Sequence, residues 1–216
     1  MEYGKIAFIF FFLSAVILIQ GCGSKVSSLL TEEWSENYAL ASYGTKSSNP
    51  RINDGDIATW GVVDPPKRVF NIILPEERWV KRVVVYSQNV VSYKLFCWDN
   101  GTEKWKAVSA VGSVEGRRSV YSDRYKMNIP RFDHRINVKT DKISIQVIKA
   151  EGDGIVTTRT PGKDDAILNH KIDFLGTGRS RRRIDLYEVY KKIPAAIREI
   201  EVYSHLEKPK SEQQAQ

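Results

Sequence analysis

The sequence has few cysteines and few histidines, and this scarcity limits both its chemistry and its means of stabilisation. Two cysteines and three histidines occur in 216 residues, so a network of disulfides is excluded and a buried core must supply the stability. His134, His170 and His205 lack the spacing of metal ligands, and neither G-x-S-x-G nor H-E-x-x-H is present. The sequence therefore argues against an enzyme.

The N-terminal region contains one long hydrophobic run, residues 6–19. Its length is below the roughly 20 residues that span a bilayer as a helix, but it suits the hydrophobic part of a signal peptide. The next residues, IQGC, end at Cys22 and resemble the lipobox of bacterial lipoproteins. The resemblance implies that residues 1–21 are removed and that Cys22 carries the lipid. The alternative is a hydrophobic leader with an incidental cysteine.

This leader predicts a location in the cell envelope, anchored to a membrane by lipid. Gly23, in place of aspartate, resembles the signal for sorting to the outer membrane if the cell is Gram-negative. A lipidated Cys22 leaves Cys97 without an intramolecular partner. The net charge of +7 favours anionic partners such as phospholipid head groups or acidic polysaccharides. We expect no nucleic-acid partner, because nucleic acid is a poor candidate outside the cytoplasm.

The remaining chain has the pattern of one all-β domain. We expect a tether over residues 22–30, a domain over 31–205 and a disordered tail over 206–216. Short β-branched and aromatic runs, separated by Gly, Asn, Asp and Pro, predict a β-sandwich or barrel. The expected strands are 68–74, 80–87, 92–98, 105–111, 135–140, 142–148, 184–190 and 197–204. Asn100-Gly101 predicts a hairpin, whereas residues 149–183 show little periodicity and form an insertion without a clear pattern.

Three segments in order resemble discoidin-like domains, also called coagulation factor 5/8 type C domains. They are residues 39–60, which end in an Asp-Gly turn and tryptophan, residues 80–108, and the closing segment IREIEVYS, residues 197–204. The resemblance implies a jelly-roll β-sandwich of the galactose-binding type. Members of this family are usually binding modules that recognise sugars, lipid head groups or proteins through loops at one end of the sandwich.

The acidic bend RINDGDIATW, residues 51–60, has two interpretations. Calcium takes six to eight oxygen ligands, and a turn rich in Asp, Asn and Thr offers several. The resemblance implies a structural calcium ion held by the Ile52 carbonyl and by the side chains of Asp54, Asp56, Thr59 and Glu199. The alternative is a turn in which the Asp and Asn side chains bond their own backbone. In either case we expect Trp60 to be a core residue.

Sugar recognition needs an aromatic face and hydrogen-bond donors, and two loops offer them. The candidates are Trp98, Asn100, Arg131, His134 and Arg135. Trp98 is alternatively a core residue, and RFDHR, residues 131–135, is alternatively a solvated loop. A second candidate surface is the cluster Arg179, Arg181, Arg182 and Arg183, which either docks on an anionic glycan or membrane surface or is simply an exposed loop.

Together these observations predict a lipid-anchored, non-catalytic module that binds carbohydrate of the envelope or extracellular matrix. The alternative is a structural subunit that binds another envelope protein through the insertion at 149–183. Fold alone does not decide between these functions.

Overall fold

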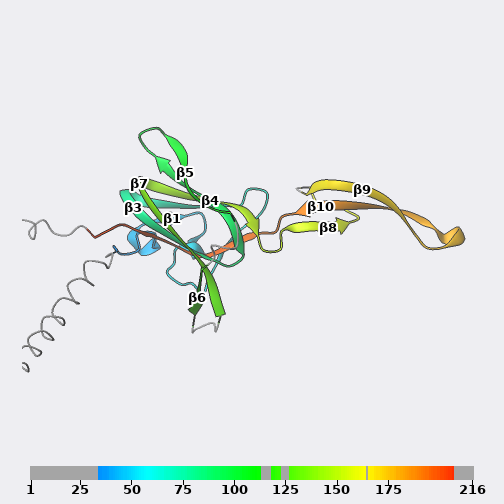
Figure 1. Ribbon diagram of the computed structural model, residues 1–216, viewed down its shortest axis with the longest axis horizontal. Coiled ribbons are helices and arrows are strands. Elements are labelled where there is room, and N and C mark those ends of the chain that lie inside the picture. Colours follow the sequence, from blue (N-terminus) through cyan, green and yellow to red (C-terminus); the bar gives the residue numbers. More distant parts are fainter. Residues whose placement is uncertain (1–33, 113–117, 123–126, 164, 207–216) are drawn as a thin grey trace, which may run out of the picture. The chain divides into compact units, whose positions relative to one another are not determined.

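The computed structural model describes residues 34–112, 118–122, 127–163 and 165–206 (Figure 1). The expected leader, Cys22, the tether and almost all of the tail lie outside these residues. Within the described ranges, no helix is both long and apolar enough to cross a membrane. Residues Glu36–Ser204 form one compact unit. Outside this unit, Trp34 and His205 form an antiparallel bridge, and their stacked rings have centroids 4.6 Å apart.

The described chain is built almost entirely from antiparallel strands. They are β1 (Lys46–Ser47), β2 (Gly61–Val63), β3 (Val69–Ser87), β4 (Val90–Asp99), β5 (Lys104–Val111), β6 (Arg118–Ser122), β7 (Met127–Ala150), β8 (Gly154–Thr158), β9 (Ala166–Leu175), β10 (Arg182–Lys191) and β11 (Ala195–Tyr203). The described ranges also contain the short 3-10 turns η1 (Ala41–Tyr43), η2 (Pro50–Ile52) and η4 (Gly178–Ser180). The predicted all-β class is confirmed.

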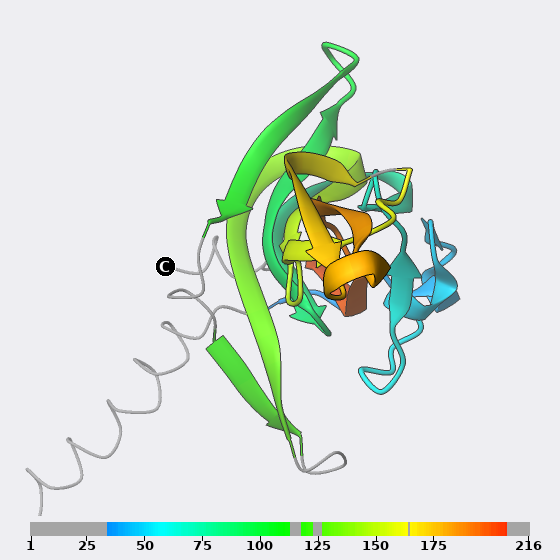
Figure 2. The same ribbon diagram turned by 90° about the vertical axis from the view of Figure 1, so that its right-hand side faces the viewer.

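The main sheet has the strand order β2-β11-β3-β7-β4-β5, with β1 paired to β3 and β6 paired to β7. Strands β3 and β7 are long and pair with each other along most of their length, with register shifts between Ile73 and Arg78 and between Val80 and Arg82. These irregularities let the sheet curl around a core (Figure 2). One layer contains β5, β4, the start of β3 and the end of β7. The other contains β2, β11, the end of β3 and the start of β7.

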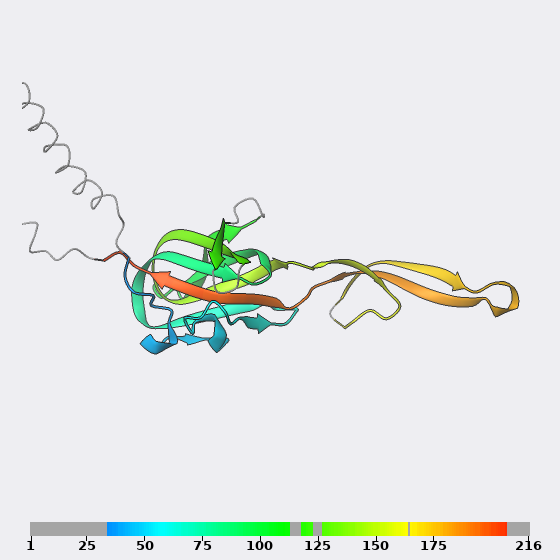
Figure 3. The same cartoon turned by 90° about the horizontal axis from the view of Figure 1, so that it is seen from below.

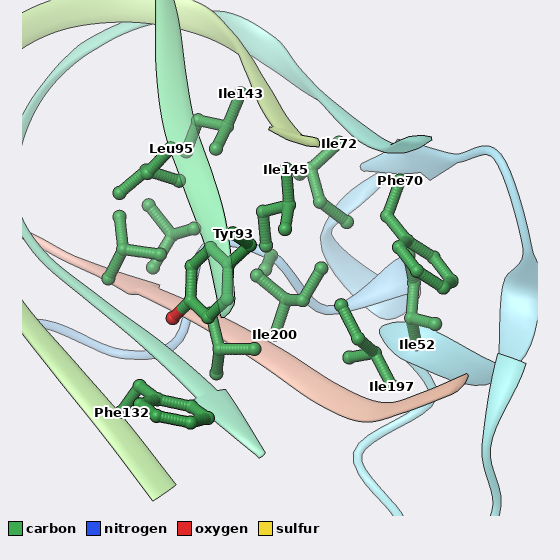
Figure 4. Packing of buried hydrophobic residues seen from close by; sticks show 14 of the residues in the cluster. Ile52, Phe70, Ile72, Tyr93, Leu95, Phe132, Ile143, Ile145, Ile197 and Ile200 are labelled. Atoms are coloured by element: carbon green, nitrogen blue, oxygen red, sulfur yellow. The ribbon is translucent and has the colours of Figure 1, made fainter. Parts of the chain in front are cut away.

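The core lies between the two layers and is formed by alternate residues of the strands (Figure 4). Ile143 and Ile145 of β7 point into it, as the alternation of residues 142–148 predicts. Ile197 and Ile200 of β11 approach from the opposite layer. Full burial of such a side chain contributes roughly 1.5–3 kcal/mol. In two places, the structure has one continuous strand where two were expected. Strand β3 covers the expected strands 68–74 and 80–87, and β7 covers 135–140 and 142–148, because a register shift does not end the pairing.

The predicted hairpin around Asn100-Gly101 joins β4 to β5, and Trp98 and Trp105 are cross-strand partners in it. The stretch at 149–183 differs from expectation. It contains β8 and β9, which pair with β10 in a separate three-stranded sheet of order β8-β10-β9 (Figure 3). Residues 184–190, expected to be a strand, therefore belong to this second sheet and not to the sandwich. We call residues 154–191 the arm.

Candidate functional site

The acidic bend lies between η2 and β2 and is folded on its own side chains. Asp54 Oδ1 accepts a hydrogen bond from the Asp56 backbone N–H at 2.9 Å, and Asp56 Oδ1 accepts one from the Ala58 N–H at 2.9 Å. Thr59 Oγ1 donates to Asp54 Oδ2 at 2.7 Å. These are the turn contacts by which Asp residues bond nearby backbone. They account for most of the bend's polar groups without an ion.

Glu199 of β11 is the exception to this pattern. Its side chain is 1% exposed, and neither carboxylate oxygen has a hydrogen-bond partner among the described residues. Burial, reinforced by the charges of Asp54, Glu201 and Asp56, raises the pKa of Glu199 to about 8; the nearby backbone N–H of Gly55, which does not reach hydrogen-bond geometry, opposes the rise. A buried carboxyl group without a partner is costly. The acidic bend therefore faces a group that a cation would stabilise.

The residues of the predicted calcium set come together at this point. Asp54 and Asp56 lie close enough to Glu199 to act on its pKa, and Thr59 is bonded to Asp54. Ile52 is the last residue of η2 and lies at the start of the bend. Oxygen is the only donor type here, which fits a hard cation. Across the described part of the chain, however, no group of three or more His, Cys, Asp or Glu side chains has the spacing to hold a metal.

Trp60, expected in the core, is 42% exposed, and that expectation was wrong. The residue precedes β2, an edge strand that pairs only with β11 among the described strands, so no further strand covers it. The Arg198 guanidinium lies 5.4 Å from the centroid of its ring, and the same guanidinium donates to the Ile57 carbonyl at 2.8 Å. Trp60 is thus a surface residue packed on a buried arginine.

The five residues predicted for sugar recognition fall into two groups. Trp98 and Asn100 belong to the β4–β5 hairpin. Arg131, His134 and Arg135 lie in the first half of β7. His134 and Asp141, which contacts Asn100 at 3.2 Å, are separated by roughly 20 Å of extended strand. The structure does not bring the two groups into one site.

Of the β7 group, His134 lines a hollow of about 370 Å³ between β5 and β7, and Arg131 and Arg135 do not. His134 is 6% exposed; its Nδ1 is 2.8 Å from Ser109 Oγ, and its Nε2 contacts the Tyr93 hydroxyl. Burial lowers the pKa of His134, and nearby Asp133 opposes the shift. Both ring nitrogens are therefore engaged inside the protein, and Arg131 and Arg135 are directed to Asp133 at 3.3 and 4.0 Å. The group has the contacts of a structural network.

In the hairpin group, Asn100 has a bracing role. Its amide donates to Glu77 at 2.9 Å and to Asp141 at 3.2 Å, which fixes the hairpin to the neighbouring strands. Trp98 is half-buried on the outer face of the sheet, away from the core, and Lys142 Nζ lies 5.0 Å from its ring centroid.

Trp105 is the aromatic residue that the sequence reasoning overlooked. Its ring meets Trp98 edge to face at 5.4 Å, and its side chain is 44% exposed. It borders a shallow hollow of about 220 Å³ on the outer face of the sheet, which is otherwise lined by Val69, Phe96, Ser144 and Gln146. We call this the Trp105 hollow. Its signal was present in the sequence, because Trp98 and Trp105 flank the predicted Asn-Gly turn and must face each other across the hairpin.

The predicted arginine cluster lies at the tip of the arm, between β9 and β10. Arg181 stacks on the Phe174 ring at 4.2 Å, and Arg183 contacts Asp185 at 3.2 Å. All four arginines are exposed. Their docking to an anionic surface stays a prediction.

Similarity to known proteins is found among solved structures. No protein-family model matches the chain, and no curated protein matches it in sequence. Among solved structures, a family 32 carbohydrate-binding module from Clostridium perfringens NanJ, in complex with galactose, shares 12% identity, with a TM-score of 0.45 over 78% of this chain and 98% of that one. Chitosan-binding module 1 from a Paenibacillus sp. IK-5 chitosanase/glucanase shares 14% identity, with a TM-score of 0.44 over 79% and 100%.

A larger protein, the family 89 glycoside hydrolase of Clostridium perfringens, shares 13% identity with a TM-score of 0.48; the match covers 79% of this chain and 15% of that one. The two-layered antiparallel sheet of this chain agrees with the β-sandwich that the discoidin-like resemblance implies.

Proposed function

We propose that the protein is a non-catalytic carbohydrate-binding module. One observation carries this proposal: an exposed indole, Trp105, borders an apolar hollow that also presents the Gln146 side chain. A pyranose ring has an apolar face of C–H groups that packs on an aromatic ring, while its hydroxyls need hydrogen-bond partners. Trp105 supplies the first requirement, and the exposed Gln146 amide supplies both a donor and an acceptor.

The position of the Trp105 hollow favours a preformed site. Trp98 holds the Trp105 ring from one side, and the hairpin beneath both rings is braced by Asn100. Ser144 is buried although it lies on the outer face, which shows that the neighbouring side chains of this face close over it. A rigid aromatic platform loses little side-chain entropy on binding.

Trp105→Ala tests the proposal directly on a glycan array and by calorimetry with the glycans that bind. We expect affinity to fall at least about tenfold, since truncation of a central aromatic contact costs roughly 2 kcal/mol or more. Trp79→Ala is the matched control, because Trp79 is 51% exposed and does not border the hollow. A silent array, or equal losses in both variants, would exclude this site.

We further propose that the acidic bend holds a structural calcium ion. The unpartnered, buried carboxylate of Glu199 supports this, together with the oxygen donors of Asp54, Asp56, Thr59 and the Ile52 carbonyl. A bound cation would supply the positive charge that Glu199 lacks. These residues, in turn, would join β11 to the bend. Calorimetric titration with Ca²⁺ tests this, and heat that Asp56→Ala abolishes supports it.

The lipoprotein anchor is a separate part of the proposal. The lipobox-like segment ending at Cys22 supports cleavage and acylation there, and an attachment to the cell envelope follows. Mass spectrometry of the protein isolated from its own membranes tests it. We expect a mature chain that begins at Cys22 with added acyl mass, whereas an unmodified or uncleaved N-terminus would contradict the anchor.

A second candidate function is that of an interaction subunit, and the arm is the observation that favours it. Its exposed apolar residues include Ile167, Ile172 and Phe174, with exposures of 56, 50 and 46%. So many large exposed apolar side chains on one strand are unusual unless a partner covers them. A photo-crosslinking residue at Ile172, with Val62 as control, tests for an envelope protein. One discrete adduct at Ile172 alone supports the subunit, and none counts against it.

A further inference from the structure

The Trp105 hollow continues into a second, larger hollow on the same face of the sheet. Val69 of β3 and Gln146 of β7 line both of them. The second has a volume of about 510 Å³ and extends over the start of β3 towards the segment that joins β10 to β11. The two hollows share this border and lie side by side over β5, β4, β7 and β3. We call the two together the outer groove.

The second hollow is strongly basic. Lys67, Lys94 and Lys192 line it and are exposed. None of the three has an ion-pair partner within the part of the chain that the structure describes, and no acidic residue is among the lining residues. Arg68, which also lines it, is buried and already neutralised by Asp153 at 2.8 Å. The three lysines therefore present uncompensated positive charge to the groove.

The aromatic end and the basic end are separated by more than one sugar unit. Trp98, Phe96 and Lys94 occupy successive outward positions of β4, each about 7 Å apart. The backbone of the Trp98–Trp105 pair thus lies roughly 14 Å from that of the Lys94–Gln146 pair, although the Trp105 and Gln146 side chains border the same hollow. A ring stacked on Trp105 can therefore meet Gln146, whereas a chain of several sugars is needed to pass over Lys67 and Lys192 of the second hollow as well.

We propose that the outer groove binds an anionic polysaccharide, with one ring stacked on Trp105 and with carboxylate or sulfate groups of the following sugars beside Lys94, Lys67 and Lys192. The inference rests on the proposed carbohydrate binding and specifies its substrate class. A cationic glycan is disfavoured by the same three lysines. A flat bilayer surface would not fit into these two concave hollows. A sugar chain can enter them and can also stack one ring on Trp105.

Titrations with acidic and neutral polymers at several salt concentrations distinguish binding of an anionic polysaccharide from aromatic stacking alone. The full chain in a non-ionic detergent is titrated with polygalacturonate, alginate, hyaluronate and heparin, and with galactan, dextran and fully methyl-esterified polygalacturonate as neutral probes. At least one acidic polymer is expected to bind more tightly than every neutral one. The difference should shrink as salt rises, because exposed charges are screened.

Two triple variants locate the charge. The first variant should weaken binding of the acidic polymer roughly tenfold; it combines Lys67→Gln, Lys94→Gln and Lys192→Gln. Lys46→Gln with Lys81→Gln and Lys163→Gln changes the net charge equally but lies outside the groove, and it should leave affinity within about twofold. Equal losses in the two variants would show a general charge effect and overturn the proposal. So would equal affinity for polyphosphate, or no preference for any acidic polymer.

Failure of the deeper inference is distinguishable from failure of the proposed function. If Trp105→Ala abolishes binding of a neutral glycan while the groove lysines change nothing, the module stands and the anionic ligand is excluded. If no glycan binds and Trp105→Ala has no effect, both are excluded.

Discussion

Arg68 Nη1 lies 2.8 Å from Asp153 Oδ1, and both side chains are almost completely closed to solvent. The same guanidinium donates to the carbonyls of Ile193 at 3.1 Å and Ile148 at 2.9 Å. Asp153 also accepts hydrogen bonds from the N–H groups of Ala150 and Ile193. This pair therefore ties the start of β3 to both connections through which the arm leaves and rejoins the sandwich.

Burial alone would raise the pKa of Asp153, but the N–H groups of Ala150 and Ile193 and the Arg68 guanidinium together lower it. We expect Arg68→Met to reduce the free energy of unfolding by about 3–5 kcal/mol, because it leaves a buried carboxylate without its counter-charge. Denaturant unfolding measures this. Lys139→Met removes the exposed ion pair with Glu77 and should cost less than about 1 kcal/mol. Similar losses in the two variants would contradict the account.

Glu199 makes the free energy of unfolding fall as pH rises. Its pKa of about 8 in the folded protein lies above the ordinary 4.5, so folding favours the protonated form. The resulting stability is fully present below about pH 4.5 and is lost as pH rises through 8, by up to about 1.4 kcal/mol per pH unit. Glu199→Gln should flatten the slope between pH 5 and 8 in thermal melts, and exposed Glu151→Gln should not. If the slope is unchanged in Glu199→Gln, the pH dependence of stability comes from another group.

Calcium provides a second measurement on the same residue. If the acidic bend holds the ion, Ca²⁺ should raise the melting temperature of the wild type more at pH 8 than at pH 5, because protons compete with the cation for Glu199. In Glu199→Gln most of this rise should disappear. No shift at pH 8 in the wild type would remove the ion from the account.

Cys97 should be chemically silent in the folded protein. Its side chain is fully buried on β4, and burial raises its pKa to about 12, so almost no thiolate is present near neutral pH. In a Cys22→Ser variant, an aromatic disulfide reagent should react with Cys97 only after denaturant is added. Rapid labelling under native conditions would show that β4 opens readily.

The arm should be separable from the sandwich. Its strands pair only with one another among the described strands, and Asp153 and Ile193, at its two ends, are hydrogen-bonded at 2.9 Å. Replacement of residues 155–191 by a short Gly-Ser linker should shift the melting temperature by no more than about 3 °C. Binding of glycan to the Trp105 hollow should persist. A loss of folding would mean that the arm stabilises the body.

The strands that alternate cleanly and the Asn-Gly hairpin were predictable because their signals are local. Residues 142–148 show a period of two, and the turn at 100–101 fixes which residues of β4 and β5 face each other. The Arg68–Asp153 pair was not predictable, because 85 positions separate its members and no local pattern marks an ion pair of that span.

The errors also have physical causes. Trp60 was expected in the core because large aromatic residues usually are buried. It directly precedes β2, which lies at the edge of the sheet, so no neighbouring strand covers its side chain. Strands β8 and β9 were missed because most of their residues are exposed, so their sequences show little apolar–polar alternation. All ten residues of β9 are exposed.

The course of β3 and β7 has a mechanical consequence. Each is one unbroken strand that begins in one layer and ends in the other, so neither layer can peel off while its neighbour keeps its shape. Melting must release both at once, in a single cooperative event. A protease that cleaves the arm should consequently leave the sandwich intact until the sandwich unfolds globally.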